Sequence, residues 1–241
     1  MTSRYALVLG ASGGIGKEIV RKLASQGWSI YVHYHKNKMV MEELSREFED
    51  HPVQLFPVHA DLTDGDSVDA LVDQIHQVHA IIHAGGVAYS GLFEDTTDEV
   101  MEHLWKVHVQ QPARLIRHLL PKMRRAGGGS IVLISSIWGE TGASLEVMYS
   151  TVKGAQNAFV KALGKELAPS FIRVNAVAPG AVDTAIMAAY SEEDRALIND
   201  EIPSGRMAQP EEIAGAVAYL VSDEASYVTS HILSINGGWY A

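Results

Sequence analysis

A serine, a tyrosine and a lysine are spaced so that they could exchange a proton with a substrate oxygen. Tyr149 lies thirteen residues after Ser136, and Lys153 follows Tyr149 by four. Residues four apart lie on one face of a helix, so the Lys153 ammonium would sit beside the Tyr149 phenol. A neighbouring cation lowers the pKa of a tyrosine, which is ordinarily near 10. With Ser136 donating a hydrogen bond to the same oxygen, the set predicts proton transfer to or from a carbonyl.

A glycine-rich turn follows the first apolar run of the chain. Its residues are Gly10-Ala-Ser-Gly-Gly14-Ile-Gly16, and a helix-period segment begins at Lys17. Glycines let the backbone approach a pyrophosphate, and the start of a helix offers free N–H groups and a positive dipole end. A plain tight turn would also explain the glycines. Their place in a strand-helix-strand pattern favours a dinucleotide site.

The end of the second apolar run suggests which dinucleotide. About 20 residues after such a turn, an acid would hold a ribose 2′-hydroxyl and a base would hold a 2′-phosphate. After this run no acid comes before Glu42, so Lys36, helped by His35 or Lys38, favours NADPH over NADH. An ordinary solvated lysine remains the alternative. Asp61 is placed to accept from an adenine amino group, or to act as a turn residue.

These residues are positioned by an alternation of strands and helices. We expect strands over 5–9, 28–34, 53–60, 78–84, 131–135, 173–177 and 231–235. We expect helices over 17–26, 39–50, 67–76, 147–168, 192–202 and 211–221, with one or two long helices over 97–125. The pattern predicts an α/β fold: a Rossmann-type doubly wound parallel sheet of about seven strands with helices on both faces. The irregular stretch from Asp183 to Met207 is expected to be a mobile lid over a ligand.

Composition excludes several other classes of protein. The 241 residues include 29 acidic and 19 basic side chains, a net charge of −10, and no cysteine. A disulfide scaffold and a cysteine nucleophile are therefore excluded, and nucleic-acid binding is disfavoured. With no long apolar run, we expect a soluble cytoplasmic protein of one domain, residues 1–241, that does not bind membranes. The histidines His76, His79 and His83 lack an adjacent carboxylate pair, so no metal site is expected.

Over its whole length the chain resembles the short-chain dehydrogenase/reductases. The matching pieces are Gly10-x-x-x-Gly14-Ile-Gly16, Asp61, the set Ser136, Tyr149 and Lys153, the segment from Asn175 through Pro179 to Thr184, and Asn236-Gly237-Gly238. The resemblance implies that Tyr149 is the general acid, that Ser136 orients the carbonyl, and that Lys153 lowers the tyrosine pKa and binds the nicotinamide ribose. The cofactor contacts that it implies are Gly10, Ser12, Gly13, Gly14, Ile15, Gly16, His35, Lys36, Asp61, Leu62, Ala84, Gly85, Tyr149, Lys153, Pro179, Gly180, Val182 and Thr184.

The chain departs from the family pattern at three places. Leu9 replaces a threonine, and Ile82-His83-Ala84-Gly85 replaces Asn-Asn-Ala-Gly. His108 stands where the family has a fourth catalytic residue, an asparagine whose backbone carbonyl holds a water. Three readings stay open: the His108 carbonyl keeps a proton relay from Lys153 to solvent, the His108 ring titrates within that relay, or His108 is a packing substitution.

Two substrates are suggested by resemblance. Length and C-terminal pattern are similar to 3-oxoacyl-[acyl-carrier-protein] reductases, but residues 126–129 and 169–172 lack the basic side chains that would receive an acidic carrier. Residues 136–144 and 153–156 more closely resemble bacterial reductases of the 5-aminopentanone modification on elongation factor P. There Trp138 would form an apolar wall, Glu140 would recognise the amine, and Met187 would line the pocket.

We therefore expect an NADPH-dependent reductase of a small or protein-borne ketone. The preferred partner is elongation factor P, with an acyl carrier protein as the alternative. A protein that binds NADPH as a sensor without turnover is an alternative of another class. The family resemblance also implies a homotetramer, with the Tyr149 helix and its predecessor in one interface and the last strand in another.

Overall fold

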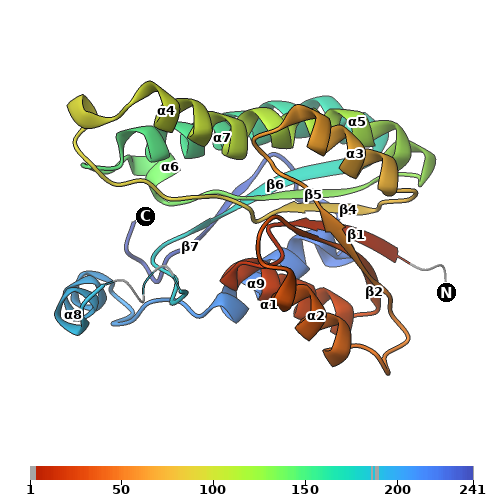
Figure 1. Ribbon diagram of the computed structural model, residues 1–241, viewed down its shortest axis with the longest axis horizontal. Helices are drawn as coiled ribbons and strands as arrows, with labels where there is room; N and C mark the ends of the chain where they lie inside the picture. Colours follow the sequence, from red (N-terminus) through yellow and green to blue (C-terminus); the bar gives the residue numbers. More distant parts are fainter. Residues whose placement is uncertain (1–3, 186, 188–189, 241) are drawn as a thin grey trace.

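A parallel sheet forms the centre of the protein. The computed structural model describes residues 4–185, 187 and 190–240. Within them the strands are β1 (Arg4–Leu9), β2 (Trp28–Tyr34), β3 (Leu55–His59), β4 (Ala80–His83), β5 (Gly129–Ile134), β6 (Ile172–Pro179) and β7 (Ile232–Ile235). They pair in parallel in the order β3-β2-β1-β4-β5-β6-β7 (Figure 1). The predicted α/β class with a doubly wound sheet is confirmed, because the order reverses direction at β1.

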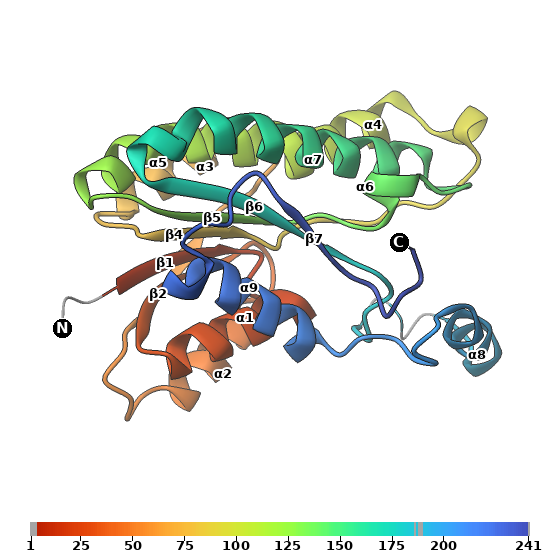
Figure 2. The same ribbon diagram turned by 180° about the vertical axis from the view of Figure 1, so that it is seen from behind.

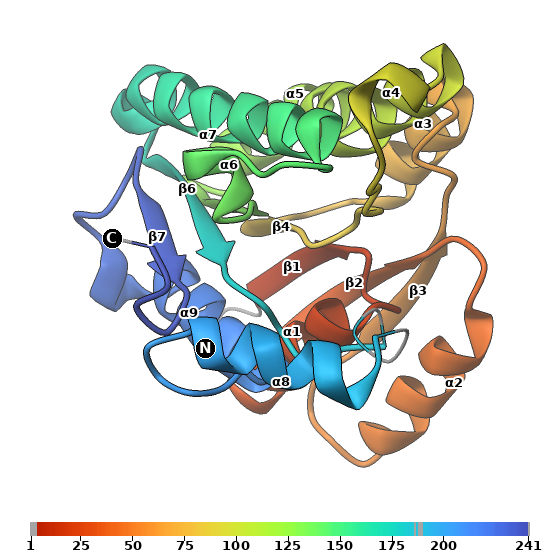
Figure 3. The same ribbon diagram turned by 90° about the vertical axis from the view of Figure 1, so that its left-hand side faces the viewer.

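Helices cover both faces of this sheet. On one face lie α3 (Gly65–Gln74), α4 (Asp98–Trp105), α5 (Gln111–Arg125) and α7 (Val147–Leu167), and on the other α1 (Gly14–Ser25), α2 (Lys38–Glu47) and α9 (Pro210–Val221) (Figure 2). The short α6 (Trp138–Thr141) packs on α7 (Figure 3), and α8 (Glu192–Glu201) stands apart from both layers (Figures 1 and 2). Short turns of 3₁₀ helix are η1 (Phe93–Asp95), η3 (Ala168–Ser170) and η5 (Asp223–Ala225).

Alternating side chains of the central strands enter two separate cores. On β1, Val8 packs in the core that includes Ile19 of α1, whereas Leu7 packs in the core that includes Leu115 of α5. All four side chains are buried. Burying a side chain of this size contributes about 1.5–3 kcal/mol, so a one-residue slip of β1 would be costly. The register of the sheet thereby fixes where each strand ends, and the strand ends carry the site residues.

Local polar contacts set where some helices begin. The Asp64 side chain accepts from the backbone N–H of Asp66 at 3.1 Å, so α3 begins two residues before its predicted start. Pro210 is the first residue of α9, which opens with a capping box between Gln209 and Glu212. Most other boundaries differ from the predicted ones by one to three residues, and α6 was not predicted at all.

The long helical segment over residues 97–125 is one rod in three parts. A π turn, η2 (Lys106–Gln110), joins α4 directly to α5. A π turn widens the backbone and leaves carbonyl groups without their usual helical partners. His108 lies within this turn and is buried.

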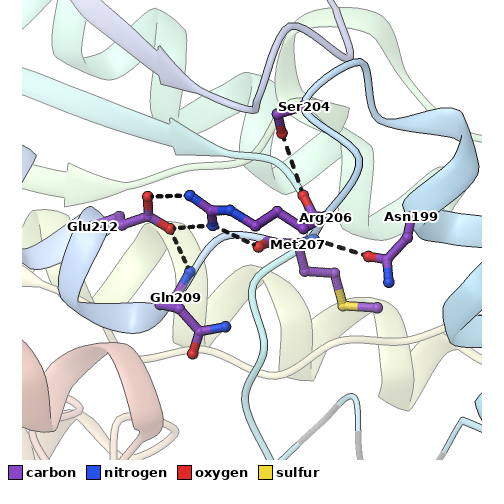
Figure 4. A network of polar contacts seen from close by, with 6 residues as sticks. All are labelled: Asn199, Ser204, Arg206, Met207, Gln209 and Glu212. Atoms are coloured by element: carbon purple, nitrogen blue, oxygen red, sulfur yellow. Dashed lines mark hydrogen bonds and ion pairs between the residues drawn. The ribbon is translucent and has the colours of Figure 1, made fainter.

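The stretch predicted as a lid contains α8 and a polar network that ties it to α9 (Figure 4). The Arg206 guanidinium donates to both carboxylate oxygens of Glu212, at 2.7 and 2.8 Å, and to the Met207 carbonyl at 3.0 Å. The Met207 N–H donates to Asn199 Oδ1 at 2.9 Å. Residues 186 and 188–189 of the predicted lid lie outside the described residues. Opening of a lid therefore stays a prediction.

No helix in the described part of the chain combines the length and the apolar character needed to span a membrane.

Candidate active site

One cavity collects most of the residues that the sequence singled out. It has a volume of about 260 Å³ and lies where the central strands end. The predicted site residues that line it are Ile15, Ala84, Gly85, His108, Ser136, Trp138, Tyr149, Lys153, Pro179, Gly180, Val182, Thr184 and Met187. Glu146 lines it as well and was not predicted. Segments that are far apart in the sequence therefore meet at one site.

The glycine turn has no room for side chains. Gly10 has a φ of +75°, and a Cβ there would lie 2.4 Å from the Gly85 Cα. A Cβ on Gly16 would lie 2.1 Å from the Gly10 carbonyl oxygen, and one on Gly14 would lie 2.9 Å from Thr184 Cγ2. Only glycine satisfies this close approach of β1, α1 and the loop after β4. The bare backbone before α1 fits the approach of a pyrophosphate.

A buried histidine that the sequence analysis did not identify holds this turn in place. The Gly10 N–H donates to His33 Nδ1 at 3.0 Å, and His33 Nε2 lies 3.1 Å from the Ala60 carbonyl oxygen. Since Nδ1 must accept, Nε2 must carry the hydrogen, and the ring is neutral. Burial lowers the pKa of His33 to about 4, which agrees with this arrangement. His33 thereby links the glycine turn to the end of β3.

The predicted nucleotide-selecting residues lie at the ends of β2 and β3. His35 and Lys36 are exposed directly after β2, and His35 Nε2 is 3.6 Å from Asp61 Oδ2. Asp61 Oδ1 accepts from the N–H and the hydroxyl of Thr63, both at 2.8 Å. Burial would raise the pKa of Asp61, but the Thr63 hydrogen bonds and the charge of His35 outweigh it and lower that pKa. Asp61 Oδ1 thus stabilises a turn, while Asp61 Oδ2 lies near the His35 ring.

Leu62 lies beside the loop that follows β4. It is buried, and its Cδ1 would lie 3.4 Å from a Cβ on Gly85. The Ala84 N–H donates to the Leu9 carbonyl at 2.9 Å, so the loop after β4 continues alongside β1. Backbone contacts therefore hold this loop although the two asparagines of the family pattern are absent.

Ser136, Tyr149 and Lys153 meet at the cavity. Ser136 follows β5, and its Oγ accepts from the Trp138 N–H at 3.1 Å. Tyr149 and Lys153 lie in the first two turns of α7, and Lys153 Nζ is 5.4 Å from the centre of the tyrosine ring. Lys153 is buried, and its Nζ donates to the Ile134 carbonyl at 2.8 Å. The predicted helix and spacing therefore bring all three together.

The electrostatics of the tyrosine differ from what the resemblance implied. Burial and the negative charge of Glu146 raise the pKa of Tyr149 to about 12, and the Ser136 hydroxyl acts only weakly against them. Lys153 does not lower the tyrosine pKa here, because burial lowers its own pKa to about 7 and its Nζ points to the Ile134 carbonyl. Tyr149 is therefore a protonated acid at neutral pH whose phenolate is disfavoured by an unpredicted neighbour.

Three further residues position the catalytic set. A Cβ on Gly139 would lie 2.7 Å from the Lys153 carbonyl carbon, so only glycine lets α6 approach α7 this closely. Asn157 Nδ2 donates to the Gly139 carbonyl at 3.0 Å, and Ser135 Oγ donates to Asn157 Oδ1 at 2.6 Å. These contacts bind the end of β5, α6 and α7 together. In the sequence, only the glycine after Trp138 could have indicated this close contact between α6 and α7.

His108 lies against the tyrosine but is already engaged elsewhere. Its ring meets the Tyr149 ring edge-on, with 5.7 Å between centroids, and its Nε2 lies 2.9 Å from the Val87 carbonyl oxygen. Burial and the charge of Lys153 lower the pKa of His108 well below its ordinary value. The His108 carbonyl accepts from Gln156 Nε2 at 2.8 Å, the place where the resemblance implied a water. This geometry favours packing over titration.

Aromatic side chains from the C-terminus surround Trp138. The Trp138 ring lies edge-on to Trp239 and to Tyr240, with 5.6 and 5.5 Å between centroids. Trp138 also lines the cavity, as predicted for a pocket wall, and so does Met187. The aromatic residues of the last segment were not predicted to reach the site.

The expectation for Glu140 does not fit the structure. Glu140 lies in a separate hollow beside Lys161 and His231, and Ser234 Oγ donates to its Oε2 at 2.8 Å. The close packing of Gly139 on Lys153 turns α6 so that Glu140 faces β7 rather than the cavity. The acid that does line the cavity is Glu146.

The three neighbouring histidines do not converge. His79 Nδ1 accepts from the Tyr5 N–H at 3.0 Å, whereas His83 is fully buried in β4. Across the residues that the structure describes, no group of three His, Asp or Glu side chains could hold a metal ion.

Comparison with known proteins agrees with this arrangement. Residues 10–240 match the family described as "Enoyl-(Acyl carrier protein) reductase". The chain is 48% identical to "Uncharacterized oxidoreductase YmfI" of Bacillus subtilis (strain 168), over 99% of each chain. It is 33% identical to "3-oxoacyl-[acyl-carrier-protein] reductase FabG" of Aquifex aeolicus (strain VF5), over 100% of this chain and 98% of that protein.

A solved structure is similar over nearly the whole chain. The angucycline C-6 ketoreductase LanV with bound NADP superposes with a TM-score of 0.92 at 28% identity, covering 98% of this chain and 95% of that one. The fold of this chain agrees with that match. The chain belongs to the short-chain dehydrogenase/reductase family of oxidoreductases.

Proposed function

We propose that the chain reduces a ketone to a secondary alcohol with NADPH as the cofactor. The observation that carries the proposal is that the loops beside the glycine turn and the set Ser136, Tyr149 and Lys153 line one cavity. A pure NADPH sensor would have no use for these three side chains together. The bare backbone of the glycine turn fits the cofactor pyrophosphate, and the segment 179–184 lies where it would hold the nicotinamide end.

The side chains divide the work of the reaction. When bound, NADPH supplies the hydride that adds to the carbonyl carbon. Ser136 donates a hydrogen bond that orients the carbonyl oxygen, and Tyr149 donates its proton to that oxygen as the C–O double bond becomes single. In this structure Lys153 Nζ donates to the Ile134 carbonyl and does not favour the phenolate. A turn of the ammonium toward Tyr149, 5.4 Å from the ring centre, would let its charge stabilise the phenolate that forms.

The preference for NADPH rests on the loop after β2. His35 and Lys36 are exposed there, where a 2′-phosphate would be held, and no acid takes the place of a 2′-hydroxyl acceptor. LanV, the ketoreductase of similar fold, has NADP bound. NADH should therefore support a lower kcat/KM than NADPH. In Lys36→Ala the kcat/KM with NADPH should fall toward the value with NADH.

The proposed substrate is the ketone of the 5-aminopentanone group on elongation factor P. Support comes from the resemblance over residues 136–144 and from Trp138, which lines the cavity and offers an aromatic ring to a cationic amine. Glu140 no longer contributes to this support. The relative from Aquifex aeolicus favours the alternative, a 3-oxoacyl group on an acyl carrier protein. The absence of basic side chains at residues 126–129 speaks against that carrier.

A direct assay separates these functions. The purified protein is offered NADPH with either ketone-modified elongation factor P or an acetoacetyl thioester of acyl carrier protein, and NADPH oxidation is followed by absorbance. Turnover of the modified elongation factor supports the proposal. Robust turnover of only the thioester would replace it with the alternative, and tight NADPH binding without turnover of either would favour the sensor.

The proposed assembly is a homotetramer. A hollow on the outer side of α4, α5 and α7 is lined by apolar residues that include Trp105, Val109, Phe159 and Leu163. Trp105 is 46% exposed in the single chain. An apolar surface of this kind suits an isologous contact with a second copy. Light scattering of the wild type and of Trp105→Glu would test it, with the variant expected to dissociate.

A further inference from the structure

We infer that Glu146 selects ketones that carry a positively charged amine. This inference rests on the proposed ketone reduction, but not on the identity of the carrier protein. Glu146 is the single carboxylate among the described residues that line the catalytic cavity. It lies three residues before Tyr149, the proton donor.

Glu146 has none of the partners that would give it a structural role. Among the described residues, burial is the one influence on the pKa of its carboxylate, with no contribution from a hydrogen-bond donor or a cation. It occupies the N-cap position of α7, yet its side chain makes no capping hydrogen bond. A half-buried carboxylate without a partner is energetically costly, and burial accordingly raises the pKa of Glu146. Such a group is more readily explained by a ligand than by the fold.

The position of the carboxylate also opposes catalysis of neutral substrates. Its charge disfavours the Tyr149 phenolate, which must form when the proton passes to the substrate. An ammonium group bound beside Glu146 would cancel that charge. The same cation would then improve both binding and proton transfer, so a carboxylate here is an advantage only for a cationic substrate.

The surroundings suit an amine. The other charged side chain that lines the cavity, among the described residues, is Lys153, whose Nζ is turned to the Ile134 carbonyl. Arg195 of α8 donates to Asp183 Oδ1 at 2.8 Å, so it is already paired. The Trp138 ring supplies an apolar face, which attracts a desolvated cation. Glu146 and Tyr149 line the same small cavity, which places the amine a few carbons from the ketone.

The test compares two ketones of equal length. One is 5-(dimethylamino)-2-pentanone, whose tertiary ammonium cannot condense with its own ketone, and the other is 6-methyl-2-heptanone, in which a CH group replaces the ammonium nitrogen. The kcat/KM of each is measured with NADPH for the wild type, Glu146→Gln and Glu140→Gln. Glu140→Gln is the matched control, because Glu140 lies in a separate hollow.

We expect the wild type and Glu140→Gln to prefer the amino ketone. Glu146→Gln should lose about 10- to 100-fold of that preference, since a hydrogen bond to a charged group is lost. The rate of Glu146→Gln with 6-methyl-2-heptanone should rise, and the apparent pKa of its pH–rate profile should fall, because the charge beside Tyr149 disappears. A merely structural role would lower both rates together and leave the profile in place.

An undiminished preference of Glu146→Gln for the amino ketone overturns the inference, whether its two kcat/KM values stay unchanged or fall by the same factor. If the wild type reduces neither ketone nor the modified elongation factor, the proposed function fails separately. Calorimetric binding of 5-amino-2-pentanol in the presence of NADP⁺ then decides the inference alone. Equal affinity for the wild type and Glu146→Gln would refute it.

Discussion

Gln156 of α7 donates a hydrogen bond from Nε2 to the backbone carbonyl of His108, at 2.8 Å, inside the protein. The family resemblance assigned that carbonyl to a relay water. Gln156 reaches the carbonyl because the π turn frees it from the helical ladder and Gln156 faces it from the next helix. The contact joins the helix that carries Tyr149 to the helix before it.

Replacing Gln156 should therefore destabilise the fold. Gln156→Met keeps the length of the side chain but leaves the His108 carbonyl without this donor, so the free energy of unfolding should fall by about 1–3 kcal/mol. Urea titration measures it. Gln74→Met is the control, because Gln74 donates to the Ala70 carbonyl at an exposed place on α3. Equal, small losses in both variants would show that the His108 carbonyl finds another partner.

Removing the Tyr149 hydroxyl should abolish most of the turnover and spare cofactor binding. In Tyr149→Phe the proton donor is lost, and kcat should fall by about 10²- to 10⁴-fold. NADPH fluorescence should still report binding, since the glycine turn is untouched. Tyr219→Phe on α9, a partly exposed tyrosine, should keep wild-type turnover. A Tyr149→Phe enzyme with undiminished kcat would mean that another group supplies the proton.

The sheet could be predicted because its signals are local. Apolar runs such as that of β1 end at turn residues, and the helices between them show a 3.6-residue period. Within the site, Tyr149 and Lys153 were identifiable because they belong to one helix, where spacing fixes the geometry.

The rest of the site depends on contacts between distant segments. Whether Glu140 or Glu146 faces the cavity is decided by the direction of α6, and that direction depends on the contact of Gly139 with Lys153. His33 is similar: in the sequence it is an ordinary residue of a predicted strand, and only the fold shows that it accepts a hydrogen bond from the Gly10 N–H. No spacing rule within one element carries this information.

A side chain at Gly139 should therefore disturb the site. The Cβ of Gly139→Ala would meet the backbone of Lys153, so α6 must move, at a cost of about 1–3 kcal/mol in stability. Turnover should fall as well, because Ser136 and Lys153 lie on either side of this contact. Gly215→Ala on α9 meets nothing within 4 Å and should be neutral or slightly stabilising. Similar stability and turnover in the two variants would argue against the role given to Gly139.

The neutral ring of His33 should make the fold sensitive to acid. Its pKa is about 4 in the folded chain and near 6.5 in an unfolded one, so the unfolded chain binds more protons between these values. The stability that His33 contributes is fully present above pH 6.5 and is lost as the pH falls toward 4, by up to about 1.4 kcal/mol per pH unit. His33→Asn keeps an acceptor near the Gly10 N–H but does not titrate, so its unfolding free energy should fall less steeply over this range.

The control is Val32→Ala, at a buried neighbour on β2, which should lower the unfolding free energy at every pH while keeping the wild-type slope against pH. Urea titrations at pH 4 to 7.5 measure the three slopes, and a wild-type slope in His33→Asn would show that other groups govern the loss.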